Sequence, residues 1–450
     1  MANDTLAASP GSGAAHLRRV LTLRDLVVVA AASIGPAFSI ATTMASMIAA
    51  AGRWTWLALT IVAVLMAMIA AGYKRLGERM RDAGSSYAWI RTAFGPEAGA
   101  YGAWVLLVAS LFAVRVTALP AGSYTLDLVA PGLASSSVAV ALVACAWIVV
   151  TAVVLWAGLR PTALLAFALV VAEVAVLAGA AAVAAGHPRP EAVAFAGAPL
   201  AWSGLVSAVV FGIWMIDGWE VCASTAEEAE GTRAVPGWGG LLGLGLTAVL
   251  MLAAIAAFSR IGSAAGFAAH ENDALAYAGE LLGGSWRTLL SVTVLVSLAA
   301  SLQATLVYLT RSIYAIGRDG LLPRALGELD RRAQPVRSIV LITLLSLAFT
   351  LPAGISTAKD AFEFALRGTS WFVGALFVLT AAAAVRIFAR EPDSRWSGAV
   401  LPGAAAAILG AILLIALKAD DPGTRGFIAA SAIIGLPLAL WRGRVVRRGV

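Results

Sequence analysis

Residues 211–220 read Phe-Gly-Ile-Trp-Met-Ile-Asp-Gly-Trp-Glu, and this stretch decides the fold. It lies inside an apolar run from about residue 202 to 229, which is long enough for the roughly 20 helical residues that cross a bilayer. Carboxylates at that depth are costly in lipid, so Asp217 and Glu220 are predicted to face a protein interior or an aqueous cavity. Because Asp-Gly continues a helix poorly, we predict a helix that breaks halfway across the membrane.

The composition indicates an all-α polytopic membrane protein. The chain has 450 residues, of which 60% are hydrophobic and 13% charged, and its mean hydropathy is +0.88. In soluble proteins about a quarter of all residues are charged. Residues 1–17 are polar and small, and the apolar segment after Arg18 and Arg19 is too long for a cleaved signal, so the first span is predicted to be retained.

The formal charge of +7 is explained by its distribution between the loops. If the chain is divided into twelve membrane spans, most of its 32 Lys and Arg residues lie in loops on the same side of the membrane as the N-terminus. The positive-inside rule then predicts a multi-pass protein of the cell membrane with both termini in the cytoplasm, and nucleic acid is not implied. Cys145, Cys222 and three scattered histidines offer no disulfide framework or metal spacing, so we expect no metal and no cofactor.

A second interruption lies in the first span, where residues 33–37 read Ser-Ile-Gly-Pro-Ala. Pro36 lacks a backbone donor and clashes with the preceding turn, so the helix is predicted to break there. Interrupted spans at matching places in two halves are typical of inverted-repeat transporters, whose binding site lies between the breaks.

Along the chain we predict four parts. They are a cytoplasmic tail (1–20), a transporter core of spans 1 to 10 (21–390), spans 11 and 12 (391–441) and a second cytoplasmic tail (442–450). Within the core the inverted repeats cover about 21–185 and 203–390. No loop is long enough to hold a soluble domain.

Three motifs resemble those of the amino acid-polyamine-organocation (APC) superfamily of transporters. Its sixth span is matched by the aromatic and acidic residues of 214–220, followed by Ala-Glu-Glu at 226–228 and Arg-x-x-Pro at 233–236. Its motif before the third span is matched by Gly84, Tyr87, Phe94 and Gly95, and its motif after the eighth span by Arg-Asp-Gly-x-x-Pro at 318–323. The resemblance covers roughly residues 20 to 390.

The resemblance implies an amino acid permease with the LeuT fold, in which twelve spans form a 5+5 inverted repeat plus two, with broken helices 1 and 6. It also implies alternating access, often driven by protons or by exchange. The substrate ammonium would lie at Trp214, Met215, Asp217 and Gly218. The substrate carboxylate would lie on amides at Ser33, Ile34, Gly35 and Ala37. The helix dipole agrees, because a helix N-terminus suits an anion and a C-terminus suits a cation.

Two positions depart from the family pattern. The first-span motif is usually Gly-x-Gly, but this chain has Gly35-Pro36-Ala37, and Pro36 cannot donate a hydrogen bond. Glu173 in span 5 lies near the place where some proton-coupled members have a lysine. We predict that Glu173 carries the coupled proton, and the alternative is a structural hydrogen bond between helices.

Several other residues have two interpretations each. Asp217 binds a cationic group or carries a proton, or it is the N-cap of the second half-helix, with Glu220 completing a capping box. Glu220 is also a possible accessory residue of the site. Trp214 is a gate over the substrate or an ordinary core residue. Arg115 in span 3 binds the substrate carboxylate as an accessory residue, or it snorkels or pairs with an acid.

Polar residues near the predicted cytoplasmic side and in span 8 are also ambiguous. Glu227, Glu228 and Arg233 form a solvated loop, or Glu228 is part of a gate closed by salt bridges. Ser301 and Thr305 are sodium ligands, or their hydroxyls bond to their own helix, as is common for such residues.

The sequence thus predicts a secondary active transporter of amino acids, coupled to protons and embedded in membrane lipid. The alternatives are a permease for polyamines or other organic amines, an amino acid exchanger, and a transporter-like membrane sensor. An enzyme is not predicted, because no nucleophile and base pair or metal cluster is visible. The residues do not indicate an oligomeric state.

Overall fold

The computed structural model describes residues 17–197, 199–271, 273–419 and 422–448. Its α-helices are α1 (Leu23–Ile34), α2 (Pro36–Ala51), α3 (Thr55–Arg79), α4 (Ser86–Phe94), α5 (Pro96–Val129), α6 (Ser137–Ala157), α7 (Leu159–Gly186), α8 (Trp202–Met215), α9 (Val221–Ser224), α10 (Val235–Phe258), α11 (Ala264–Ala269), α12 (Ala274–Leu282), α13 (Trp286–Arg318), α14 (Val336–Thr350), α15 (Ala358–Phe388), α16 (Leu401–Ala419) and α17 (Pro422–Arg448). Short turns of 3-10 helix are η1 (Gly52–Trp54), η2 (Pro131–Leu133), η3 (Val193–Phe195), η4 (Ala226–Glu228), η5 (Arg324–Gly327) and η6 (Leu351–Ile355), and η7 (Trp396–Val400) is a π-helical turn.

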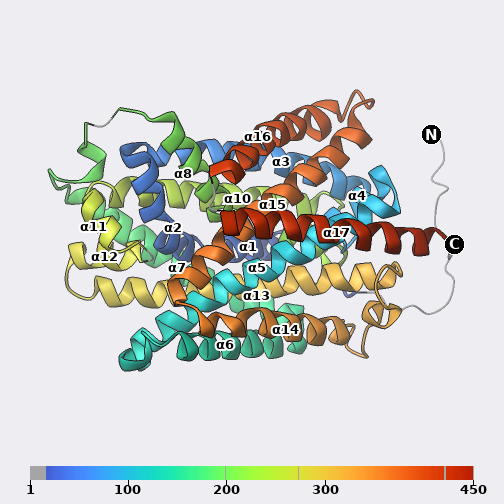
Figure 1. The fold of residues 1–450 in the computed structure, drawn as a ribbon, viewed down its shortest axis with the longest axis horizontal. Coiled ribbons are helices and arrows are strands. Elements are labelled where there is room, and N and C mark those ends of the chain that lie inside the picture. Colours follow the sequence, from blue (N-terminus) through green and yellow to red (C-terminus); the bar gives the residue numbers. More distant parts are fainter. Residues whose placement is uncertain (1–16, 198, 272, 420–421, 449–450) are drawn as a thin grey trace.

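The described residues form a bundle of long apolar helices. Ten helical segments are long and apolar enough to cross a membrane, and the first of them, Leu23–Arg79, contains α1, α2 and α3 in succession. α8, with 14 residues, is shorter. The prediction of an all-helical polytopic protein is therefore confirmed. α4 and the C-terminal end of α17 lie at one end of the bundle, called the α4 end below, and α11 and α12 lie at the opposite end (Figure 1).

The first predicted break lies between α1 and α2. Thr22 and Asp25 form a capping box that starts α1, and the helix ends at Gly35, whose φ of 59° and ψ of 68° are left-handed. Pro36 then opens α2, where its missing N–H costs no helical hydrogen bond. Local chemistry alone accounts for this break, because glycine adopts the left-handed region readily and proline cannot continue the preceding helix.

The second predicted break follows α8. The helix stops at Met215, Gly218 has a φ of 105°, and helical structure returns only at Val221. The part after the break is short, since α9 has four residues and is followed by the turn η4. The remaining stretch to α10 is irregular, and the chain is still buried at its start, since Ala226, Glu228 and Ala229 are 2%, 1% and 0% exposed.

The helices packed around these breaks come from the whole length of the chain. α13 contacts α1, α2, α5 and α7, and α10 contacts α1 and α9. Buried apolar side chains form one large core that includes Ile34, Phe38, Trp214 and Met215. The two breaks therefore lie inside the protein, where irregular backbone is tolerated at membrane depth.

The predicted tails are described only in part. Residues 1–16 and 449–450 lie outside the described residues. The end of the N-terminal tail is held in place, because the N–H groups of Val20 and Leu21 both donate to the carbonyl oxygen of Glu228. α17 continues through residues 442–448 to Arg448.

Candidate functional site

The two breaks are in direct contact. A Cβ atom built on Gly218 would lie 2.7 Å from Ser33 Oγ and 2.9 Å from the Ser33 carbonyl carbon. Ser301 of α13 joins the same point, because its hydroxyl donates to the Ser33 carbonyl oxygen over 2.9 Å. The ends of α1 and α8 thus meet against α13, although Ser33 and Gly218 are far apart in the sequence.

A cavity of about 50 Å³ opens beside this contact. Six of the residues predicted to bind substrate or assist it line the cavity, namely Ser33, Ile34, Trp214, Asp217, Gly218 and Glu220. The remaining lining includes Phe38, Ser110, Thr305, Tyr308 and the apolar Val373 and Leu376.

The acidic groups of the cavity do not form the predicted capping box. Glu220 itself is the N-cap residue of α9, its side chain makes no capping hydrogen bond, and its Oε2 instead accepts from the N–H of Gly218 over 2.9 Å. The capping interpretation of Asp217 is therefore wrong, because the chain turns at Gly218 before any helix begins. The side chain of Asp217 makes no hydrogen bond or ion pair with a described residue, and the residue lines the cavity.

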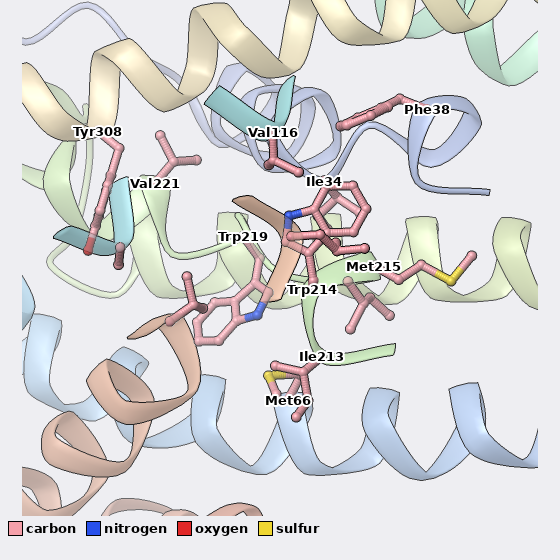
Figure 2. Close-up of a cluster of buried hydrophobic side chains, with 14 of the residues drawn as sticks. Ile34, Phe38, Met66, Val116, Ile213, Trp214, Met215, Trp219, Val221 and Tyr308 are labelled. Carbon is pink, nitrogen blue, oxygen red and sulfur yellow. The ribbon is translucent and has the colours of Figure 1, made fainter. Parts of the chain in front are cut away.

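Trp214 lies against Phe38 from the opposite break. The two rings meet edge to face, with centroids 5.1 Å apart and planes at 88°. In Figure 2, Trp214 lies between Phe38 and Tyr308, which occupy opposite ends of the group of side chains. Since all three line the cavity, α2, α8 and α13 each contribute an aromatic wall.

Glu173 of α7 connects three helices. Its Oε1 accepts 2.7 Å hydrogen bonds from the N–H of Ala37 in α2 and from the hydroxyl of Ser297 in α13. The side chain is fully buried, and Oε2 has no partner among the described residues. The structure thus contains the predicted hydrogen bond between helices, and proton coupling stays a prediction.

The backbone amides predicted to bind the substrate carboxylate are occupied in this structure. Gly35 N–H donates to the carbonyl oxygen of Ala31, Ala37 N–H donates to Glu173, and Phe38 N–H donates to Ser297 Oγ. Ser33 and Ile34 lie within α1, so their amides belong to that helix. A carboxylate of the protein thus already caps α2 in this conformation, and binding of a substrate carboxylate at these positions stays a prediction.

Met215 and the two hydroxyls of α13 lie around the same region. Met215 is fully buried but does not line the cavity. Ser301 donates to Ser33 and Thr305 donates to the Ser301 carbonyl oxygen, so both hydroxyl protons are engaged with backbone carbonyls. Thr305 thus bonds to its own helix, whereas Ser301 bonds to the end of α1. Among the described residues, no group of three or more His, Cys, Asp or Glu side chains could hold a metal ion.

Arg115 lies outside the cavity lining. Its Nη1 donates to the carbonyl oxygen of Phe349 over 3.2 Å, and its Cζ lies 5.3 Å and 5.8 Å from the ring centroids of Phe349 and Phe364. The guanidinium therefore packs between α14 and α15, and a direct contact with a substrate carboxylate is not supported.

Glu228 forms a buried ion pair at the α4 end. Arg311 of α13 donates to both of its carboxylate oxygens, over 3.0 Å and 3.1 Å, and Gln334 accepts from the same guanidinium. The side chains of Arg311 and Glu228 are 0% and 2% exposed. The solvated-loop interpretation is thus wrong for Glu228. Sequence reasoning missed Arg311, which is one of six Lys or Arg residues in the basic stretch 311–337.

A second group of ion pairs lies nearby. Arg318 contacts Glu227 over 2.9 Å and Asp82 over 3.2 Å, while Arg91 contacts Asp319 over 2.8 Å. These pairs join the segment after α9 to the loops next to α3, α4 and α13. The motif at 318–323 was visible in the sequence, but its partners were not.

Comparison with known proteins agrees with this architecture. A family model described as "Amino acid permease" matches residues 21–436, nearly the whole chain. The chain belongs to the amino acid permease family. It is an APC superfamily permease, and so a transporter and not an enzyme.

Curated relatives of this permease are transporters of similar length. It is 25% identical over 360 residues to the branched-chain amino acid permease BcaP of Lactococcus lactis, covering 74% of this chain and 75% of the relative. It is 28% identical over 353 residues to uncharacterized transporters of Mycobacterium tuberculosis and Mycobacterium bovis, covering 76% of each chain. The match supports amino acid transport across a membrane.

Proposed function

We propose that this permease is a secondary active transporter that carries amino acids across the cell membrane by alternating access, coupled to protons. The observation that carries the proposal is the contact of the two breaks beside an acidic cavity. Interrupted helices that meet at mid-membrane are the usual setting of a transporter site. In this proposal the chain makes twelve crossings, with α1–α2 and α8–α9 each forming one crossing.

The acidic side of the cavity suits the substrate ammonium. α8 ends at the cavity, and the C-terminal end of a helix carries partial negative charge. Asp217 adds a carboxylate without a described partner, and Glu220 lies beside it. A cation placed there would gain charge-assisted hydrogen bonds.

The remaining lining suits a small aliphatic amino acid. Ile34, Val221, Val373 and Leu376 supply apolar walls. Ser33 and Ser110 supply hydroxyls, which in this proposal donate to the substrate carboxylate in place of the occupied amides of α2. The relative BcaP is named a branched-chain amino acid permease, which points to the same substrate class.

Glu173 is the proposed proton carrier. An ionised carboxylate is costly without water, yet it strengthens the bonds from Ala37 and Ser297. Loss or gain of a proton therefore changes how firmly α7 holds the start of α2. This links the proton to one of the two broken helices that form the cavity.

Two barriers close the cavity in this proposal. Trp214 and Phe38 cover it from the sides of α8 and α2. The ion pair of Glu228 and Arg311 holds the α4 end closed, and the density of Lys and Arg in its loops assigns that end to the cytoplasm. Both barriers open in turn during transport.

Flux measurements in proteoliposomes test the function. A panel of labelled amino acids is offered with and without an imposed pH gradient, and uptake of leucine, isoleucine or valine driven by the gradient is the expected result. Asp217→Asn is expected to reduce uptake at least tenfold, whereas Glu328→Gln, at an exposed surface pair with Arg337, is not. Absence of flux for every amino acid would reject the proposal, and absence of flux for amines as well would favour a sensor.

A second candidate is a permease for organic amines. It is favoured by one observation, namely that the charged residues lining the cavity in the described chain are the acids Asp217 and Glu220, while the α2 amides are already taken. The same panel includes monoamines and polyamines. Flux of amines without flux of amino acids would select this candidate.

A further inference from the structure

A second cavity lies at the α4 end, apart from the cavity between the breaks. Its volume is about 640 Å³. It is lined by parts of four segments, namely the residues before α1 (Leu17, Arg19), the loop after α3 (Arg81, Asp82), the segment around η4 and before α10 (Glu227, Gly231, Thr232, Arg233) and the end of α13 (Arg318).

The two acids in this cavity are both bonded to neighbours. Asp82 accepts from the N–H of Gly84 and from Arg318, and Glu227 accepts from the N–H of Ala83 and from Arg318. Arg318 therefore serves both acids, and each of them also has a backbone donor. With four arginines and two acids, the lining keeps a net charge of +2.

Three arginines in the cavity make no ion pair with a described residue. Arg19 and Arg233 are exposed and make no side-chain hydrogen bond or ion pair with a described residue. Arg81 donates from Nη2 to the carbonyl oxygen of Thr232 over 3.1 Å, but its buried Nε has no partner. Burial lowers the pKa of the Arg81 guanidinium, and the charges of Arg19 and Arg233 lower it further. Three cations thus repel one another around an open space.

We propose that this cavity binds a phosphate group, held between Arg19, Arg81 and Arg233. The planar fork of each guanidinium matches phosphate oxygens, and three donors from three segments can surround one tetrahedral anion. The phosphate belongs to an anionic lipid headgroup or to a soluble phosphate compound. Basic pockets between membrane helices are known to take lipid headgroups.

The bound anion would link three segments. The ion pairs of Arg318 already join two of them, through Asp82 and Glu227, and the N–H groups of Val20 and Leu21 hold the third to Glu228. Arg19 precedes α1, Arg81 follows α3 and Arg233 precedes α10. The anion therefore stabilises the closed arrangement of the α4 end. This role goes beyond the proposed transport and does not depend on the identity of the substrate.

Binding is tested on the full-length protein in detergent, in two arms. In one arm phosphatidylglycerol is added, with phosphatidylcholine as the reference, and retained lipid is counted by native mass spectrometry. In the other arm inorganic phosphate is added, with chloride at equal ionic strength as the reference, and the thermal midpoint is recorded. We expect binding in at least one arm, which also identifies the source of the phosphate.

Arginine variants connect that binding to the cavity. The double variant R81A/R233A should weaken it on the order of tenfold or more, because each removes a charge-assisted contact. R19A, at an exposed side chain, gives a second variant that leaves the packing of Arg81 intact. The matched control is R331A/R332A, two exposed arginines in the loop before α14. No binding in either arm, or equal loss in the control, would overturn the proposal.

Discussion

Gly218 lies so close to Ser33 that a Cβ atom at Gly218 would be 2.7 Å from Ser33 Oγ. This contact joins the two broken helices, because Gly218 follows α8 and Ser33 is near the end of α1. Glycine is also required by the backbone, since its φ is 105°. Both the small size and the conformation of Gly218 are therefore needed for the breaks to meet.

Gly218→Ala is expected to reduce substrate flux at least tenfold. The left-handed backbone costs an alanine about 1–3 kcal/mol, and the added methyl group pushes Ser33 away from the cavity. Flux and thermal midpoint are measured together in the same preparation. Gly245→Ala in α10 is the control, because a Cβ there meets nothing within 4 Å, and it should be neutral or slightly stabilising. Equal flux in the two variants would contradict this prediction.

Glu173→Gln is expected to abolish the dependence of uptake on an imposed pH gradient while some exchange of substrate persists. Glutamine can still accept from Ala37 N–H and Ser297 through its carbonyl oxygen, so the contact between α7 and α2 is kept. Uptake is measured at several external pH values. If the gradient drives the variant as strongly as the parent protein, Glu173 does not carry the proton.

Removing Arg311 should destabilise the protein strongly. Arg311→Ala leaves Glu228 buried without its cation, which costs about 3–5 kcal/mol. The double variant Glu228→Gln/Arg311→Met should recover much of the loss, because no uncompensated charge remains. The stability of both variants is measured by thermal unfolding in detergent. Arg337→Ala breaks an exposed pair with Glu328 and should cost at most about 1 kcal/mol; a similar loss in all three variants would contradict the prediction.

Asp273, which lies outside the membrane spans, is expected to make the stability of the protein depend on pH. It is the N-cap of α12, where its Oδ1 accepts from the N–H of Ala276, and burial raises the pKa of its carboxyl above the ordinary 3.8. The pKa of Asp273 is higher in the folded than in the unfolded state. Between these two pKa values the folded state therefore binds more protons, and the free energy of unfolding falls as the pH rises from the lower pKa to the higher one.

Asp273→Asn keeps a good N-cap residue but does not titrate. The variant should lack this fall and be more stable than the parent above the folded pKa. Thermal midpoints between pH 4 and 8 test this expectation. The prediction would be contradicted if the thermal midpoint of the parent protein rose with pH over this range relative to that of the variant.

Much of the fold could be predicted from the sequence because it depends on local chemistry. The length of each apolar run limits the number of crossings, and Gly35-Pro36 and Asp217-Gly218 end their helices through the backbone preferences of those residues. The length of the helix after the second break could not be predicted. α9 has only four residues, because Glu220 bonds back to Gly218 and the chain then packs against the segment before α1.

The candidate site was predictable in its location and less so in its contacts. Asp217, Trp214 and Ser33 line the cavity as expected. The amides of α2 are capped by Glu173, which is 136 residues from Ala37 in the sequence. Glu228 pairs with Arg311, 83 residues away. No periodicity or motif spacing relates such distant partners.

The sequence by itself determined where this chain crosses the membrane and where two crossings break, since hydropathy, proline and glycine act over a few neighbouring residues. Only the tertiary structure decided which buried charges find a partner. Glu173 and Glu228 are both fully buried acids, but one accepts an amide and a hydroxyl and the other an arginine. That difference arises because helix packing, and not local sequence, brings a donor to each carboxylate.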